Sequence, residues 1–264
     1  MSRAALAPLV ALALAGCGGP EAAPRAPSNT PTAAADAPVA EPDGVVVLDP
    51  GTGPRRALRY QIADGTTRHA TYHARTTPAG AKPVDIDLTW DYAFARAGDD
   101  AVVTLTLGPT QVPVPAGASG AWHLGARGKH APTPTTNAGR VVLEQTQAEH
   151  MLPIVPVAAI GVGARWTVPM GISAGLGAAP LPGQATWTLV SRTDTTAVAR
   201  ATIDVPPTDV DVGAGRLTMG GRGTIDARVD LAAYTATATM TLELTAGDDD
   251  TATAAAIAID LRIE

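Results

Sequence analysis

Histidine and aspartate side chains alternate along two neighbouring segments, 67–75 and 85–91, and residues of these types can bind a divalent metal ion. Antiparallel pairing of the segments brings opposite charges face to face in one register: His69 with Asp91, His73 with Asp87, and Arg75 with Asp85. Residues four apart on a strand are about 13 Å from each other, which is too far for both histidines to hold one ion. The pattern therefore favours cross-strand pairs on an exposed sheet face, and we expect no metal and no cofactor.

Ser173 lies in Gly171-Ile-Ser173-Ala-Gly175, which matches the letters of the hydrolase nucleophile elbow, G-x-S-x-G. The elbow requires a strand, a sharp turn and a helix. The eight residues that follow contain two prolines and two glycines, so they cannot form that helix. We therefore expect a protein that is not an enzyme. An envelope hydrolase that uses Ser173 or an acidic pair is kept as an alternative.

Cys17 is the only cysteine, so disulfides within the chain are excluded. It ends an N-terminal segment with one positive charge at Arg3, an apolar run over 4–15 and small residues before the cysteine. The apolar run is shorter than the roughly 20 residues that a transmembrane helix needs. The layout predicts a secretory signal.

Leu14-Ala15-Gly16-Cys17 resembles the lipobox of bacterial lipoproteins. The resemblance covers the first 17 residues and implies that 1–16 are a signal peptide, cut before a Cys17 that carries acyl chains. Such chains bury many methylenes at about 0.8 kcal/mol each, so the membrane would be a permanent partner. Gly18, in place of Asp, implies by the same resemblance that the protein is sorted to the outer membrane of the cell envelope.

The residues after the signal predict a tether and one β-rich domain. Residues 17–44 are rich in proline and alanine and contain no apolar cluster, so we expect a disordered tether. The domain is expected over 45–264, as one unit or as two packed halves joined near 115–160. A net charge of −6 excludes a nucleic-acid partner, because phosphates require a basic surface.

Period-two alternation dominates the expected domain and predicts an antiparallel meander that forms a β-sandwich or a partly open barrel. The clearest strands are 84–94, 101–107, 234–244 and 257–263. A hairpin around Asp64-Gly65 is expected to pair 58–62 with 70–74. One short helix is expected over 142–152, ending before Pro153.

Large aromatic side chains are scarce, at 3% of the chain, and four of them are candidates for lining a ligand cavity: Trp90, Tyr92, Phe94 and Trp166. Core packing is the alternative role for each. The resulting hypothesis is a membrane-anchored envelope lipoprotein, similar in pattern to all-β envelope lipoproteins. Its β domain would bind an apolar ligand or another envelope component, such as a lipid or a protein. A purely structural scaffold is the alternative.

Overall fold

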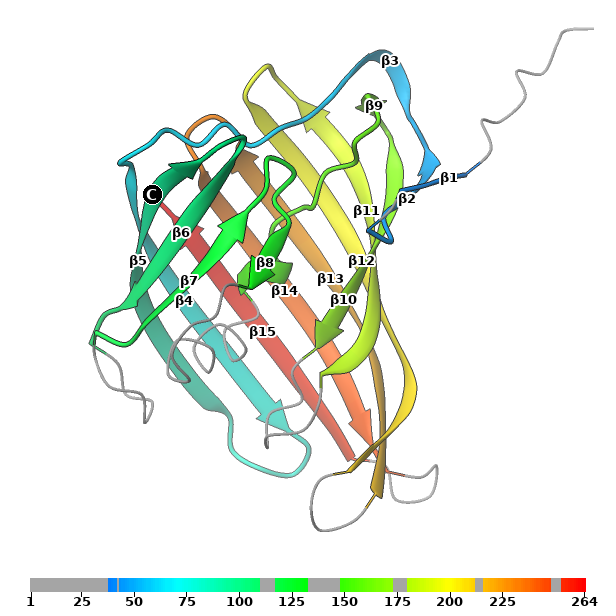
Figure 1. Ribbon diagram of the computed structural model, residues 1–264. Helices are drawn as coiled ribbons and strands as arrows, with labels where there is room; N and C mark the ends of the chain where they lie inside the picture. Colours follow the sequence, from blue (N-terminus) through cyan, green and yellow to red (C-terminus); the bar gives the residue numbers. More distant parts are fainter. Residues whose placement is uncertain are drawn as a thin grey trace, which may run out of the picture. The chain divides into compact units, whose positions relative to one another are not determined.

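Antiparallel β structure makes up most of the chain that the computed structural model describes, which is residues 38–41, 43–109, 117–132, 148–172, 180–211, 216–247 and 253–264 (Figure 1). This confirms the mainly β fold class. The described residues all fall in one compact unit, Ala35–Glu264. No helix in this part of the chain is long and apolar enough to cross a membrane.

The described ranges contain fifteen strands. Their bounds are β1 Val39–Ala40, β2 Val46–Asp49, β3 Thr52–Arg56, β4 Thr67–Pro78, β5 Val84–Ala97, β6 Asp100–Leu107, β7 Ser119–Leu124, β8 His130–Pro132, β9 Ile160–Val162, β10 Arg165–Ile172, β11 Leu181–Arg192, β12 Thr196–Asp211, β13 Arg216–Asp230, β14 Thr235–Ala246 and β15 Thr253–Ile263.

Thirteen of these strands form one antiparallel sheet, in the order β1-β2-β10-β11-β12-β13-β14-β15-β4-β5-β6-β7-β8, and β3 pairs with β9 in a second sheet. Strands that follow one another along the chain pair in two runs, β4 to β8 and β10 to β15, as expected for a meander. Pairing of β15 with β4 joins the two runs, and Leu261 lies opposite Tyr72 there. The paired strands end at β1 and β8, so within the described residues the sheet is an open barrel or sandwich and is not closed.

Alternation of side chains places one face of this sheet in the core and the other in water. On β14 the buried residues are Ala236, Ala238, Met240, Leu242 and Leu244, whereas the threonines between them point outward. The same alternation on the neighbouring strands produces one continuous core.

All nine aromatic residues of the sequence are buried in that core. Tyr92 packs against Trp90, Phe94, Trp122 and Tyr234, with ring centroids 5.9 to 6.1 Å apart. Trp166 and Trp187 stack on each other in a separate group. Among the described residues, the exposed face of the sheet therefore offers hydroxyl, carboxylate, guanidinium and imidazole groups but no tryptophan, tyrosine or phenylalanine ring.

The expected hairpin between 58–62 and 70–74 does not form. Leu58 and Tyr60 are buried as their alternation suggests, but their segment is not a strand. The backbone N–H of Tyr60 donates to Ala126 and that of Gln61 to Leu231, while 70–74 pairs with β5 and β15. Alternation reports which side chains are buried and does not identify the partner strand.

The helix expected over 142–152 is described only at its end. Ala148–His150 forms one 3₁₀ turn, and residues 142–147 lie outside the described ranges. The chain then runs as an irregular, mostly buried segment through Met151 and Val155 to β9. Pro153 and Pro156 lack the N–H groups that a regular helix would need here.

Candidate functional site

A trough of about 760 Å³ lies on the outer face of the main sheet, over strands β12 to β15, β4 and β5. Two rows of paired, outward-facing residues line it. We name the first the acidic row: Asp226, Thr239, Asp260, His73 and Asp87, one residue per strand from β13 to β5. We name the second, two residues away on each strand, the basic row: Arg228, Thr237, Arg262, Thr71 and Thr89.

The hollow follows from side-chain size along the rows. Strand β14 presents only short threonine side chains outward at 235–241, whereas β13 and β15 on either side carry aspartate and arginine. Long flanking side chains around a low central strand leave a depression. The two rows lie about 7 Å apart, the distance between residues i and i+2 on a strand.

Ion pairs occupy part of each row. Arg200 Nε lies 2.6 Å from Asp226 Oδ1, and His73 Nδ1 lies 2.8 Å from Asp87 Oδ1. Arg262 contacts Glu264. Asp260 and Arg228, both exposed, form no ion pair or side-chain hydrogen bond with the described residues. The trough therefore presents an unpaired carboxylate on one side and an unpaired guanidinium on the other.

Three carboxylates surround the imidazole of His73. The hydrogen bond with Asp87 is the largest cause that raises the pKa of His73 above its usual value of 6.5, and the charges of Asp87, Asp85 and Asp260 add to it. Burial opposes the shift. Protonated His73 therefore offsets part of the negative charge of the acidic row, and that charge becomes more negative as the pH rises through the raised pKa.

The register proposed for His69, His73 and Arg75 is confirmed residue by residue. His69 Nδ1 lies 2.8 Å from Asp91 Oδ1, so each histidine bonds to its own aspartate. Arg75 Nε lies 3.9 Å from Asp85 Oδ1. Among the described residues, no group of three or more histidine, cysteine, aspartate or glutamate residues is arranged to hold a metal ion.

The aromatic candidates from the sequence do not meet at the trough. Trp90, Tyr92 and Phe94 lie together in the core, and Trp166 lies in the other aromatic group. Their side chains are at most 5% exposed and point to the inner side of the sheet. Cys17 and Ser173 lie outside the described residues.

The sequence analysis did not single out the trough, but a signal for it was present. Asp226-Ala-Arg228 and Asp260-Leu-Arg262 repeat the same Asp-x-Arg pattern on strands that flank a threonine strand. The sequence does not give the register between β13, β14 and β15, and only that register shows that these residues lie on one surface.

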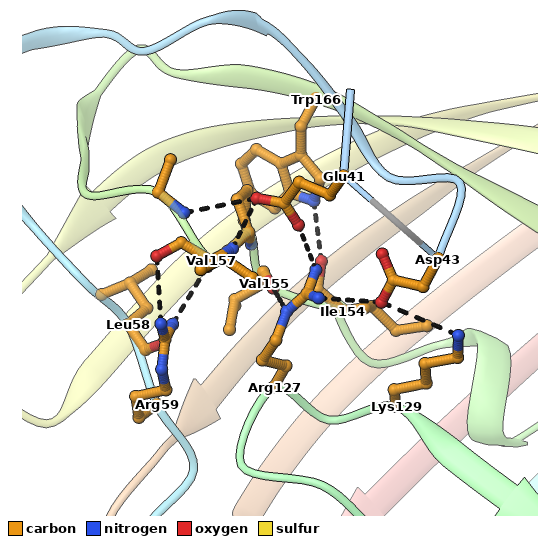
Figure 2. A network of polar contacts seen from close by, with 12 residues as sticks. Glu41, Asp43, Leu58, Arg59, Arg127, Lys129, Ile154, Val155, Val157 and Trp166 are labelled. Carbon is orange, nitrogen blue, oxygen red and sulfur yellow. Dashed lines mark hydrogen bonds and ion pairs between the residues drawn. The ribbon is translucent and has the colours of Figure 1, made fainter. Parts of the chain in front are cut away.

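A second polar cluster, which we name the ionic clamp, lies where the two ends of the sheet approach each other (Figure 2). Arg127, in the turn between β7 and β8, forms ion pairs with Glu41 and Asp43. The other oxygen of Glu41 accepts hydrogen bonds from the backbone N–H groups of Val157 and Ala158. The clamp thus connects the chain ahead of β2 to the β7–β8 turn and to the segment before β9.

Backbone contacts extend the ionic clamp into the core. Arg127 Nε donates to the carbonyl of Val155, and the indole N–H of Trp166 on β10 donates to Ile154. Arg59 donates to the carbonyls of Pro156 and Val157. The side chain of Glu41 is only 6% exposed and both of its oxygens accept bonds within the cluster, which assigns the ionic clamp a structural role.

A scan against protein-family models and searches of curated proteins and of solved structures found no match.

Proposed function

We propose that the protein is a lipid-anchored bacterial envelope lipoprotein whose β domain is a non-catalytic binding module. The trough carries this proposal, because it is a concave surface in which the charged groups of Asp260 and Arg228 have no partners among the described residues. The tether after Cys17 would hold this surface away from the bilayer, where it could bind another envelope component.

Burial of the aromatic residues favours an envelope component over an apolar ligand. Those residues fill the inner side of the sheet by packing against one another. The trough, by contrast, carries aspartate and arginine side chains on β13 and β15, on either side of the threonines of β14. These charged groups can form hydrogen bonds and charge pairs that select a partner with polar groups.

Site-specific crosslinking in cells tests the proposal. A photo-crosslinking amino acid replaces Thr239 in the trough of the full-length chain, and a matched control replaces Thr245, which faces outward on the same strand, six residues further along and outside the trough. We expect a discrete adduct from position 239 and none from 245. Equal labelling, or no adduct at either position, would contradict a binding role for the trough and favour the scaffold alternative.

A further inference from the structure

Charges in the trough repeat at a fixed interval. In the acidic row the carboxylates of Asp226, Asp260 and Asp87 stand on β13, β15 and β5, which are every second strand of the sheet. In the basic row Arg228 and Arg262 stand on β13 and β15. Neighbouring strands are about 4.8 Å apart, so the like charges recur about every 9.6 Å across the strands.

We propose that the occupant of the trough is a peptide segment in the polyproline II conformation with a charge pattern that repeats every three residues. This inference rests on the proposed binding role of the trough. A polyproline II helix has three residues per turn and a rise of about 3.1 Å per residue, so its repeat of about 9.3 Å matches the spacing of the charges.

Other peptide conformations fit this spacing less well. In an extended β-strand, side chains on one side recur about every 6.8 Å, which falls out of step with the row within one repeat. In an α-helix the side chains of one face recur about every 5.4 Å, once per turn, which does not match the spacing of the charges either. The spacing therefore favours polyproline II.

The three faces of a polyproline II helix also suit a trough with two unlike sides. One face would present lysine or arginine to Asp260, which has no ion pair among the described residues, and to Asp226 and Asp87, which it would share with Arg200 and His73. The second would present glutamate or aspartate to Arg228 and Arg262, and the third would point to solvent. The backbone of this helix has no internal hydrogen bonds, so its carbonyl and N–H groups are free to bond with the hydroxyls of Thr237 and Thr239. The repeat expected of the ligand is Lys-Glu-Pro or its equivalent.

Fluorescence anisotropy with the detergent-solubilised full chain tests this proposal. One labelled, end-capped peptide has four Lys-Glu-Pro repeats, and the control has the same composition as blocks of four lysines, four glutamates and four prolines. We expect the repeat peptide to bind more tightly than the block peptide, and binding to weaken as ionic strength rises, because the pairs are exposed.

Neutral substitutions identify the contacts. Asp260→Asn and Arg228→Gln should each weaken binding of the repeat peptide by about threefold, as the loss of an exposed charge pair does. Arg216→Gln, at the far end of β13, is the matched control and should bind as the unmodified protein does. All three positions are exposed or at a strand end, and circular dichroism checks that each variant folds.

Equal affinity for the repeat and block peptides, or affinity unchanged in Asp260→Asn and Arg228→Gln, would overturn the inference. Absence of peptide binding would overturn it too. In that case an adduct at position 239 in cells would still support a binding role for the trough, with a ligand of another class.

Discussion

The ion pairs of Arg127 and Arg200 differ in how much of each side chain is buried. Arg127 is 17% exposed and pairs with Glu41 and Asp43, which are 6% and 16% exposed, whereas Arg200 is 65% exposed and pairs with Asp226. One oxygen of Asp43 is buried without a hydrogen-bond partner among the described residues. Removing Arg127 would therefore leave the buried Glu41 with only its two backbone hydrogen bonds, and Asp43 with only Lys129, whose Nζ lies 3.7 Å from Asp43 Oδ2.

Arg127→Met should lower the free energy of unfolding by about 3 kcal/mol, the cost of removing one partner of a buried ion pair. Arg200→Gln, the exposed control, should lower it by about 0.5 kcal/mol. Urea unfolding followed by tryptophan fluorescence measures both. Similar midpoints for the two variants would show that the ionic clamp does not stabilise the fold.

The raised pKa of His73 leads to a pH prediction. Asp87→Asn should move that pKa down toward 6.5, because it removes a negative charge and leaves only a neutral amide oxygen to accept the hydrogen bond. An NMR titration of the imidazole protons measures the shift. Asp91→Asn, beside His69, is the matched control and should leave the pKa of His73 unchanged.

The same shift fixes the sign of a stability effect. Because the pKa of His73 is higher in the folded state than in the unfolded chain, its contribution to stability is fully present below pH 6.5 and is lost as the pH rises through the raised pKa. Asp87→Asn should flatten this part of the profile of unfolding free energy against pH. If the unfolding free energy of the Asp87→Asn variant kept the same dependence on pH, that dependence would arise from titratable groups other than His73.

Among the strands, β14 shows how alternate residues of one strand face the core and the solvent. Met240 is 2% exposed and packs in the core, while its neighbour Thr239 is exposed on the trough floor. Both sit in continuous ladders with β13 and β15. Thr239 and Met240 therefore both have a partner residue on each neighbouring strand, and they differ in whether the side chain is exposed or buried.

Met240→Ala should destabilise the protein by about 2 to 4 kcal/mol because it leaves a cavity in the core. Thr239→Ala should change stability by less than about 0.5 kcal/mol, as substitutions on a solvated surface do. Thermal or urea unfolding compares the two variants. A large loss of stability in Thr239→Ala would mean that the outer face is covered in the native protein.

For the whole molecule, the proposed lipid anchor requires the sulfur of Cys17. Cys17→Ser in the full-length chain should abolish incorporation of labelled palmitate and move the protein from the membrane to the soluble fraction, because no acyl chain can then be attached. Ser2→Ala is the control and should leave both readouts unchanged. Palmitate in the Cys17→Ser protein would refute a lipid anchor at this residue.

The alternation of apolar and polar residues was sufficient to predict many of the strands. Alternation located the strands now seen as β5, β6, β14 and β15 and fixed the register of β4 on β5, because charge pairing and burial act between residues close in sequence. It misassigned 58–62, whose partners Ala126 and Leu231 are far along the chain. The alternation also did not indicate that Glu41 and Asp43 contact Arg127, because both lie in residues 17–44, which were predicted to form the tether.

The sequence by itself determined the β class, the alternation of buried and exposed side chains and the expectation of a lipid anchor, since each depends on neighbouring residues alone. Only the tertiary structure decided that β15 lies beside β4. This pairing brings Asp260 next to His73, although the two residues are far apart in the sequence. The trough exists because of that pairing. Long-range strand contacts are selected by the free energy of the whole core, and no local pattern encodes that choice.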